Sequence, residues 1–454
     1  MVKIGLEIHG YINTNEKLFC KCKAIHGLKF SKPNTNICPI CTGQPGAKPM
    51  LPNKNAVQKS LQIALILKCK INSKLTWQRK HYDWPDLPKG YQNTISGAHA
   101  FPIGEKGKFL DINIRECHLE EDPAAWNPKT GEIDYNRSGL SLIEIVTEPE
   151  FSSSQEVIDW LKQLIIALSY IKSLDKNAGI KADVNISLPE LKGVRVEIKN
   201  VNSLSNIKTA IESEIARQKA GEVVKIQETR MFDESKGTTI KMRSKEQAED
   251  YRFISDPDLP VIIFEKTRIE KTNLSLPETP QEKLQKLIKK YKIEKKYAEI
   301  LTKKIEIAEF FEKIIEKINP KLASQWITIE LLSVLNYNKK ELEDVDIKPE
   351  HFIELLKLIE DKKITELKAK EILRGWKEKS SSPEIGIGKH EQISDIKEIE
   401  KVAKEIIKEN PKAIEDYKNG KKESLNFLIG KVMQKTNKRA DFKTSRELLE
   451  NLIK

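Results

Sequence analysis

Cysteine, histidine and glycine are scarce in this chain and unevenly placed. All six cysteines lie at or before Cys117, and five of the seven histidines lie at or before His118. No glycine occurs between Thr238 and Arg374. Residues that bind metals or transfer protons, together with tight turns, therefore concentrate in the first third of the chain, and the later part is expected to be helical.

Long apolar runs are also absent. No run approaches the roughly 18 apolar residues that a membrane-spanning helix needs. The first residues, MVKIGLEIHGYI, lack the charged, apolar and small-residue order of a signal peptide, so we expect a cytoplasmic protein. The content of 39% hydrophobic and 32% charged residues is typical of globular proteins.

Several catalytic and nucleotide-binding motifs are missing. The chain has no GxxxxGK[ST] loop, no GxGxxG fingerprint, no GxSxG elbow and no Ser-Lys amidase signature. These absences exclude a P-loop nucleotide site, and the chain shows no obvious nucleophile of its own. Basic residues outnumber acidic ones by 79 to 67, a net charge of +12. This surplus favours a polyanionic partner such as tRNA, although a lysine-rich composition that keeps the protein soluble explains it equally well.

Hydrophobic periodicity predicts an α+β fold. In IGLEIHGYI, apolar Ile4, Leu6 and Ile8 alternate with Glu7, His9 and Tyr11, the period of a strand. The segment VNISLPELKGVRVEIKNV predicts a hairpin that turns near Pro189 and Gly193, and SSSQEVIDWLKQLIIALSYI predicts a helix capped by Ser154. A βαβ rhythm is missing, so we expect a mainly antiparallel sheet with helices.

The length of 454 residues predicts about three domains. We expect a cradle-like sheet domain over residues 1–276, which ends near Pro277 and Pro280. An all-helical domain over 277–385 follows, and the cluster KSSSPEIGIG then leads to a small helical and basic tail domain over 386–454.

The spacing Cys20-Lys-Cys22 followed by Cys38-Pro-Ile-Cys41 is the sharpest local signal. Two close pairs of thiolates suit one tetrahedral Zn²⁺, and four cysteine ligands leave no open position for water, so a structural role is expected. Disulfides conflict with the absence of a secretion signal. Four unligated core thiols remain the alternative.

A second group of residues is acidic. Glu7 and His9 share one strand face, HLEED covers residues 118–122, and Glu144 lies between Ile143 and Ile145 in an apolar strand. A carboxylate there needs a partner or a metal, and a hard cation such as Mg²⁺ or Mn²⁺ suits this set. The competing interpretation is surface acids plus one ion-paired glutamate.

The predicted hairpin carries a third group of polar residues. Asp183, Asn185 and Ser187 alternate with apolar residues on one strand, and Arg195, Glu197 and Lys199 do so on the other. This face either holds a polar substrate or is simply the solvated side of a half-buried sheet.

Taken together, these segments resemble the GatB subunit of tRNA-dependent amidotransferases. The resemblance rests on IGLEIHGYINTNEKLFCKC, NTNICPICTGQPGAKPMLPN, RKHYDWPDLPKGYQ, HLEEDP, DYNRSGLSLIEIVTEPE, DVNISL, VEIKNVNSL, QETRMFDESKGTT and DYRFISDPDLP, in order over residues 4–260. A weaker match, FLIGKVMQKTNKRAD, resembles the C-terminal domain of the family. The related GatE type carries a large insertion, for which the path from Glu197 to Pro277 leaves no room.

The resemblance implies a function. Such a subunit uses ATP to phosphorylate the side-chain carboxylate of misacylated Glu-tRNA(Gln) or Asp-tRNA(Asn). Ammonia from a partner glutaminase then displaces the phosphate. The implied partners are a GatA-type amidase subunit, a small GatC-type subunit and the tRNA, and the implied cofactors are Mg²⁺ or Mn²⁺ and Zn²⁺. The alternative is a non-catalytic, zinc-containing RNA-binding scaffold.

The resemblance also assigns roles to residues. It implies that the catalytic groups include four metal ligands, namely Glu7, His9, Glu121 and Glu144. It also implies a catalytic role for Lys80, which would contact phosphate or the aminoacyl end of the tRNA. It implies substrate or ATP contacts at Glu120, Glu148, Asp183, Asn185, Glu197, Lys199 and Asn200.

Overall fold

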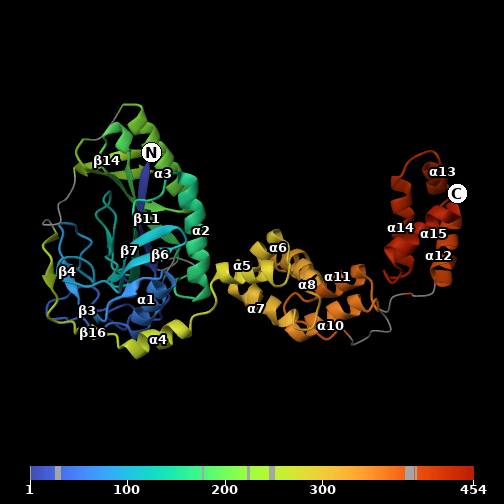
Figure 1. The fold of residues 1–454 in the computed structure, drawn as a ribbon, viewed down its shortest axis with the longest axis horizontal. Helices are drawn as coiled ribbons and strands as arrows, with labels where there is room; N and C mark the ends of the chain where they lie inside the picture. Colours follow the sequence, from blue (N-terminus) through green and yellow to red (C-terminus); the bar gives the residue numbers. More distant parts are fainter. Residues whose placement is uncertain are drawn as a thin grey trace. The chain divides into compact units, whose positions relative to one another are not determined.

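The computed structural model describes residues 2–25, 32–175, 178–221, 225–244, 251–383, 393 and 396–453. The chain forms two compact units, Met1–Thr279 and Pro280–Lys454, whose helices and strands are labelled in Figure 1 where there is room. In the described residues no helix is both long enough and apolar enough to cross a membrane.

The first unit is built on a twelve-stranded sheet. The strands along its main path are β14 (Thr238–Ser244), β13 (Glu228–Asp233), β12 (Val196–Asn202), β11 (Ile180–Ser187), β1 (Lys3–Tyr11), β10 (Ser141–Thr147), β7 (Ile112–Glu121), β5 (Gln92–Thr94), β4 (Gln78–Lys80) and β15 (Ile254–Ser255). Strand β6 (Gly104–Phe109) also pairs with β7, and β2 (Lys70–Ile71) pairs with β6. Strand β12 runs parallel to β13, whereas the other strand pairs of the described sheet are antiparallel.

Two small ribbons and four helices complete this unit. Strand β3 (Lys74–Leu75) pairs with β16 (Ile262–Ile263), and β8 (Ala125–Trp126) pairs with β9 (Ile133–Asp134). The helices are α1 (Lys54–Ile66), α2 (Ser154–Tyr170), α3 (Leu204–Lys219) and α4 (Lys266–Leu274). The α+β prediction is confirmed. The sequence predicted no βαβ unit, but α3 connects the parallel strands β12 and β13, so one such unit is present in an otherwise antiparallel described sheet.

The two faces of the central strands differ in polarity. Ile4, Leu6 and Ile8 of β1 are at most 1% exposed, and the apolar residues of the neighbouring strands on the same face join them in one core with α1, α2 and α3. Figure 1 shows α2 running along the sheet. Because successive side chains of a strand point to opposite faces, a set of polar residues alternates with these apolar ones and is directed to the other face, namely Glu7, His9, His118, Glu120, Glu144, Asp183 and Asn185. That face carries the candidate site.

Two local predictions differ in detail from the structure. Helix α2 begins at Ser154, but its cap is Ser153, whose hydroxyl accepts a hydrogen bond from the Glu156 amide at 3.2 Å. The connection between β11 and β12 is a short 3₁₀ turn, Pro189–Leu191, followed by Lys192 at φ 54°. The left-handed residue is therefore Lys192, one position before the glycine in the predicted turn.

The second unit is helical. Its helices are α5 (Pro280–Lys289), α6 (Lys295–Leu301), α7 (Ile305–Ile314), α8 (Pro320–Gln325), α9 (Leu332–Tyr337), α10 (Pro349–Glu360), α11 (Glu366–Gly375), α12 (Ile396–Glu409), α13 (Pro411–Lys418), α14 (Glu423–Lys435) and α15 (Phe442–Ile453). Buried apolar side chains form one cluster between Leu287 and Trp376 and another between Ile393 and Ile453. The predicted boundary between 385 and 386 lies outside the described residues, so the three-domain division stays a prediction.

Candidate active site

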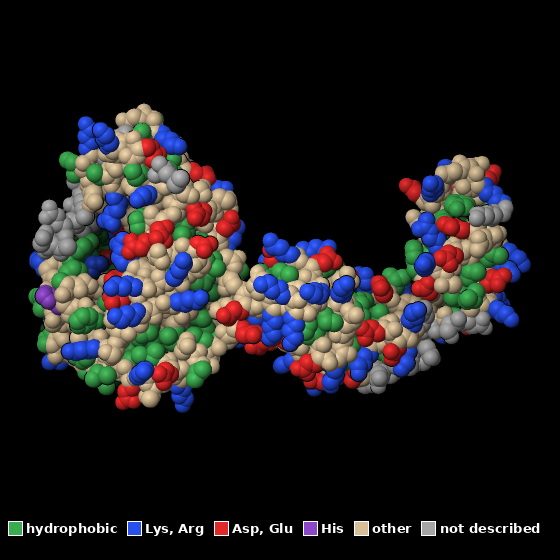
Figure 2. Space-filling view, in the orientation of Figure 1, with side chains coloured by type: hydrophobic (Ala, Val, Ile, Leu, Met, Phe, Trp, Pro, Cys, Tyr) green, Lys and Arg blue, Asp and Glu red, His purple; other side chains and the backbone are tan. Residues whose placement is uncertain are grey.

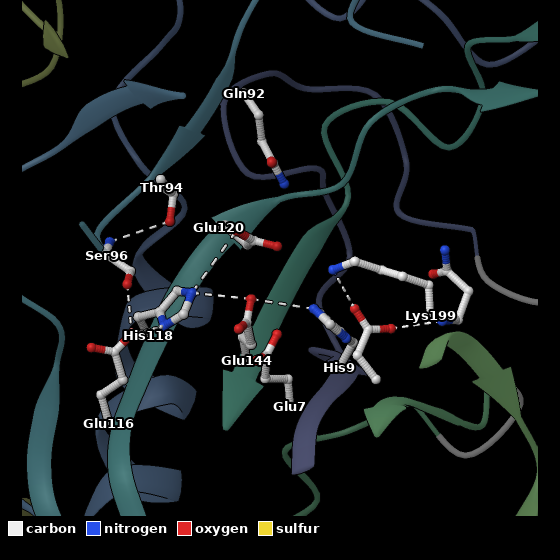
Figure 3. A network of polar contacts seen from close by, with 12 residues as sticks. Glu7, His9, Gln92, Thr94, Ser96, Glu116, His118, Glu120, Glu144 and Lys199 are labelled. Atoms are coloured by element: carbon white, nitrogen blue, oxygen red, sulfur yellow. Dashed lines mark hydrogen bonds and ion pairs between the residues drawn. The ribbon is translucent and has the colours of Figure 1, made fainter. Parts of the chain in front are cut away.

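Strand register places a carboxylate between two histidines. On β10, Glu144 lies opposite His9 of β1 on one side and opposite His118 of β7 on the other. Directly opposite residues of antiparallel strands share a face, so the three side chains meet on the polar face of the sheet. Figure 3 shows Glu144 between the two imidazole rings.

The contacts at Glu144 are close. Its Oε2 lies 3.2 Å from His9 Nε2 and 3.3 Å from His118 Nε2. Burial alone would raise the pKa of Glu144, but His118 and His9 hold the pKa well below its usual range. Burial lowers the pKa of both imidazoles, but the neighbouring carboxylates, above all Glu144, raise it overall, to about 9 for His9 and about 10 for His118. Charged and paired, Glu144 satisfies the expectation that a buried carboxylate needs partners.

The structure brings Glu120, rather than Glu121, to this cluster. One ligand atom each from His9, Glu120 and Glu144 lies within 4.8 Å of the others, a geometry that could hold a metal ion. Glu121 follows Glu120 on the same strand and so points to the opposite side. There its carboxylate contacts Lys89 and accepts a hydrogen bond from the Asn93 amide at 2.9 Å. The assignment of Glu121 to the metal-ligand set therefore requires correction to Glu120.

A second acidic group lies on β1, β11 and β12. Oxygens of Glu7, Asp183 and Glu197 lie within 4.8 Å of one another. The Lys199 ammonium donates hydrogen bonds to Asp183 Oδ2 and Glu197 Oε1, both at 2.8 Å. Burial would raise the pKa of Asp183, but Lys199 lowers it overall. The sequence assigned Glu7 to the same metal as Glu144, whereas the structure groups it with the residues around Lys199.

A cavity of about 260 Å³ opens on the polar face. Six of the residues singled out in the sequence line it: His9, Lys80, Glu120, Asp183, Lys199 and Asn200. Aromatic and cationic side chains that the sequence did not assign also line it, namely Tyr11, Tyr82, Trp84, Arg137, Lys181 and Tyr251. The cavity thus combines carboxylates, cations and aromatic rings in one concave site, as ligand sites commonly do.

Lys80 faces the acidic floor of this cavity. Its Nζ lies 4.8 Å from the centre of the Tyr251 ring. Burial lowers its pKa, but Glu120 and Glu144 raise it overall, so the side chain is an ammonium. The neighbouring Arg79 points elsewhere and pairs with Asp256 at 2.8 Å, which fixes β4 against β15. This pairing holds the strand that presents Lys80.

A separate network shapes the other end of the cavity. The Tyr11 hydroxyl donates to Asp122 Oδ2 at 2.6 Å, and Arg137 Nε lies 3.1 Å from the same oxygen. Arg137 also donates to the carbonyls of Pro123 and Ala124, at 3.0 and 2.7 Å. These bonds fix the segment that follows β7. The charge of Arg137 is balanced by Asp122, while its guanidinium still borders the cavity.

The remaining predicted residues lie beside or outside the cavity. Asn185 donates from Nδ2 to Glu7 Oε1 at 3.0 Å. Asn200, which lines the cavity, donates from its backbone amide to Asp183 Oδ1 at 2.6 Å. Glu148, by contrast, is half-buried and pairs with Arg115 at 3.1 Å. It is not among the residues that line the cavity, so the structure does not bring it together with the others.

His118 and Lys89 are the residues that sequence reasoning missed most clearly. His118 stands two positions before Glu120, and residues at that spacing on a strand share a face. The alternation in HLEED could therefore have placed His118 with Glu120 and separated both from Glu121. Lys89 lies in a loop, where no periodicity relates it to Glu121.

The four predicted cysteines meet in space. The sulfurs of Cys20, Cys22, Cys38 and Cys41 lie within 4.8 Å of one another, and all are free thiols. Cys41 Sγ lies 3.8 Å from Cys38 Sγ and 4.0 Å from Cys22 Sγ. Four sulfurs around a Zn²⁺ at about 2.3 Å would lie roughly 3.8 Å apart. The cluster could thus hold a tetrahedral metal ion.

Comparison with known families covers both units. A family model described as the GatB/GatE catalytic domain matches residues 2–270, and one described as the GatB domain matches residues 309–453. The first match contains the cavity and the cysteine cluster, and the second covers most of the helical unit.

Similar proteins align along the whole chain. Over 473 aligned residues the chain is 44% identical to the B subunit of the aspartyl/glutamyl-tRNA(Asn/Gln) amidotransferase of Methanocaldococcus jannaschii, covering 100% of this chain and 98% of the relative. The proteins of the same description from Methanopyrus kandleri and Methanothermobacter thermautotrophicus are each 42% identical. The alignment covers 98% of the first and 100% of the second, and all of this chain in both cases.

Proposed function

The chain belongs to the GatB family, and from this premise we propose that it is the subunit that activates and amidates a misacylated tRNA. ATP phosphorylates the side-chain carboxylate of Glu-tRNA(Gln) or Asp-tRNA(Asn), which releases ADP. Ammonia then attacks the acyl phosphate, phosphate leaves, and the amide remains on the tRNA. The observation that carries this proposal is Glu144, whose side chain is 14% exposed, held between His9 and His118 beside a cavity lined by Lys80 and Lys199.

The residues at the cavity floor fit a hard divalent cation. His9, Glu120 and Glu144 offer one imidazole nitrogen and two carboxylate oxygens, a donor set suited to Mg²⁺ or Mn²⁺. When bound, such an ion neutralises phosphate charge and orients the transferred group. His118 also contacts Glu144 and keeps this carboxylate in place.

The chain's own cations supply the remaining electrostatic stabilisation. Lys80 and Lys199 line the cavity as ammonium groups, and both can donate hydrogen bonds to phosphate oxygens of a bound substrate. Phosphoryl transfer needs positioning and charge neutralisation more than a protein nucleophile. This requirement agrees with a sequence that shows no obvious nucleophile. Aromatic Tyr82, Trp84 and Tyr251 wall the cavity and limit the access of water that would hydrolyse an acyl phosphate.

The proposed reaction requires partner subunits that supply ammonia, and it requires a bound tRNA. Ammonia comes from a GatA-type amidase subunit, and a small GatC-type subunit completes the complex. The helical unit, including its tail over residues 386–454, holds the tRNA mainly by contacts to the phosphates and by recognition of the tRNA shape. On the visible face, Figure 2 shows lysine and arginine side chains interspersed with acidic ones over both units. The net charge by itself therefore does not locate the tRNA surface.

The cysteine cluster holds a structural Zn²⁺ in this proposal. Its loop contacts the segment that carries Arg137. Ser138 Oγ donates to the Cys41 carbonyl at 2.8 Å, and the Leu18 amide donates to the Gly139 carbonyl at 2.8 Å. A metal that fixes the cysteine loop would also fix this wall of the cavity.

The test uses the chain with its partner subunits and ammonium chloride in place of glutamine. Labelled Glu-tRNA(Gln), ATP and Mg²⁺ are supplied, and the amino acid on the tRNA is identified. We expect conversion to Gln that requires ATP and persists when the amidase subunit is inactivated. Replacement of Glu144 by Gln should abolish the conversion and leave tRNA binding intact.

A scaffold without catalysis would behave differently. A complex that binds tRNA but converts neither Glu-tRNA(Gln) nor Asp-tRNA(Asn) with ammonium would contradict the proposal. Intact amidation in Glu144→Gln would contradict the role of this carboxylate. Exposed Glu150, which accepts from Asn113 Nδ2 at 2.8 Å, offers the matched control, because Glu150→Gln should leave the conversion unchanged.

A further inference from the structure

The sheet carries two acidic groups, and a lysine occupies the second. Glu7, Asp183 and Glu197 bring three carboxylates together, as close to one another as the ligand atoms of the first group. The Lys199 ammonium lies 2.8 Å from an oxygen of Asp183 and 2.8 Å from one of Glu197. Its position between the two carboxylates is the one that a cation would take.

A buried amide oxygen also belongs to this second group. Asn185 is 9% exposed and lies opposite Glu197 in the β11–β12 register. Its Nδ2 donates to Glu7 Oε1 at 3.0 Å, while its Oδ1 is buried without a hydrogen-bond partner in the described structure. The side chain that already contacts Glu7 thus has an oxygen that can join the three carboxylates in an all-oxygen set of the kind that hard cations bind. A buried acceptor without a hydrogen bond or a cation contact costs free energy, so Asn185 Oδ1 would be stabilised by a bound cation.

We propose that the Lys199 ammonium takes the place of a second divalent cation at Glu7, Asp183, Asn185 and Glu197, next to the first cation site at His9, Glu120 and Glu144. Two-metal phosphoryl-transfer sites use two divalent ions to stabilise the attacking and the leaving oxygens. Here the chain binds one divalent ion, and its own lysine provides the second positive charge. Lys199 also lines the cavity, so the same ammonium reaches a bound phosphate. This last step rests on the proposed function, whereas the occupancy of the second site does not.

The charges in the second group support the exchange of a lysine for a metal. Lys199 supplies the positive charge that Asp183 and Glu197 contact directly, and its removal leaves the carboxylates of this group without that charge in a partly buried place. Uptake of another cation in the position of the ammonium would relieve their mutual repulsion. Removal of Lys199 should therefore open the second position to Mg²⁺ or Mn²⁺.

The experiment counts Mn²⁺ ions bound to the zinc-loaded full-length chain by the electron paramagnetic resonance of free Mn²⁺, without ATP or tRNA. We expect one Mn²⁺ ion at the two acidic groups of the wild type and two ions in Lys199→Met. The affinity of the second group for Mn²⁺ should be at least about 10-fold higher in Lys199→Met than in the wild type. The matched control Lys199→Arg keeps a cation in place and should bind one. In Lys199→Met, the additional change Asp183→Asn should remove the second ion again.

Two results would overturn the proposal: a single ion in a folded Lys199→Met protein, or two ions in the wild type. If Lys199→Met does not fold, the Mn²⁺ count of the Glu144→Gln variant tests the proposal instead. It should bind no Mn²⁺, because the first site is lost and Lys199 fills the second; one bound ion would show that Lys199 does not exclude metal. Since no substrate is present, these outcomes stay separate from any failure of amidation.

Discussion

His118 Nε2 lies 3.3 Å from Glu144 Oε2, the same carboxylate oxygen that His9 approaches from the other strand. His118 is only 3% exposed, whereas His9 lines the cavity. The two imidazoles therefore differ in position: His9 borders the cavity, and His118 contacts the carboxylate from the buried side. We expect His9 to serve as a metal ligand and His118 to position Glu144. In metal sites such supporting groups orient the ligands and affect affinity strongly.

Replacement of His118 by Gln should weaken Mn²⁺ binding by about 10- to 100-fold, because Glu144 loses a fixed partner. A Mn²⁺ titration measures the change, and circular dichroism checks that the variant is folded. His99 is exposed and serves as the control, since His99→Gln should bind Mn²⁺ like the wild type. An unchanged affinity in His118→Gln would show that His9 alone positions Glu144.

Glu120 and Glu121 should respond in opposite ways to the same substitution. Glu120→Gln removes a candidate metal ligand, and we expect Mn²⁺ affinity to fall by at least about 10-fold. Glu121→Gln leaves buried Lys89 without its carboxylate and should lower the free energy of unfolding by about 3 kcal/mol, with Mn²⁺ affinity retained. Mn²⁺ titration and urea unfolding of both variants separate the two effects. Loss of Mn²⁺ binding in a folded Glu121→Gln protein would return Glu121 to the metal-ligand set.

The polar face of the sheet was predictable because the side chains of a strand alternate between its two faces every second residue. The alternation of Glu7 and His9 with Leu6 and Ile8 indicates which side chains share a face, and the structure confirms it. A carboxylate between Ile143 and Ile145 likewise indicated that Glu144 needs partners. Both inferences use only neighbours in sequence.

Other features depended on contacts between distant segments. The sequence could not show that Glu7 groups with Asp183 and Lys199 instead of with Glu144, because this depends on the order and register of β10, β1 and β11. Glu148 was assigned to the site from its place in a motif, but it pairs with Arg115 of β7 outside the cavity. Register, rather than residue type, decides these cases.

Loss of the cysteine cluster should destabilise the first unit. We expect Cys38→Ser to lose near-stoichiometric zinc and to lower the melting temperature by about 10 °C, because a structural metal contributes folding free energy directly. Metal analysis of protein prepared without chelator and a thermal melt measure the two changes. Cys69 is buried in the apolar core away from the cluster, so Cys69→Ser should keep its zinc even if it melts earlier. A wild-type protein without zinc would refute the zinc assignment.

Lys80 tests whether the cavity performs the phosphoryl chemistry. Its ammonium faces Glu120 and Glu144, and no ion pair neutralises it at bonding distance in the described structure. We therefore expect Lys80→Ala to slow ammonium-dependent amidation by about 100- to 1000-fold, the usual effect of losing a group that stabilises transition-state charge.

Binding of the tRNA body should change little in Lys80→Ala, because the proposed function assigns that binding to the helical unit. Exposed Lys74 on β3 is the control for the loss of one positive charge, and Lys74→Ala should keep its rate. Lys80→Arg retains the charge but not the compact ammonium, so an intermediate rate is expected. Equal rates for Lys80→Ala and Lys74→Ala would place the phosphoryl transfer away from Lys80. The functional assignment of the cavity would then depend on Lys199 and the metal ligands alone.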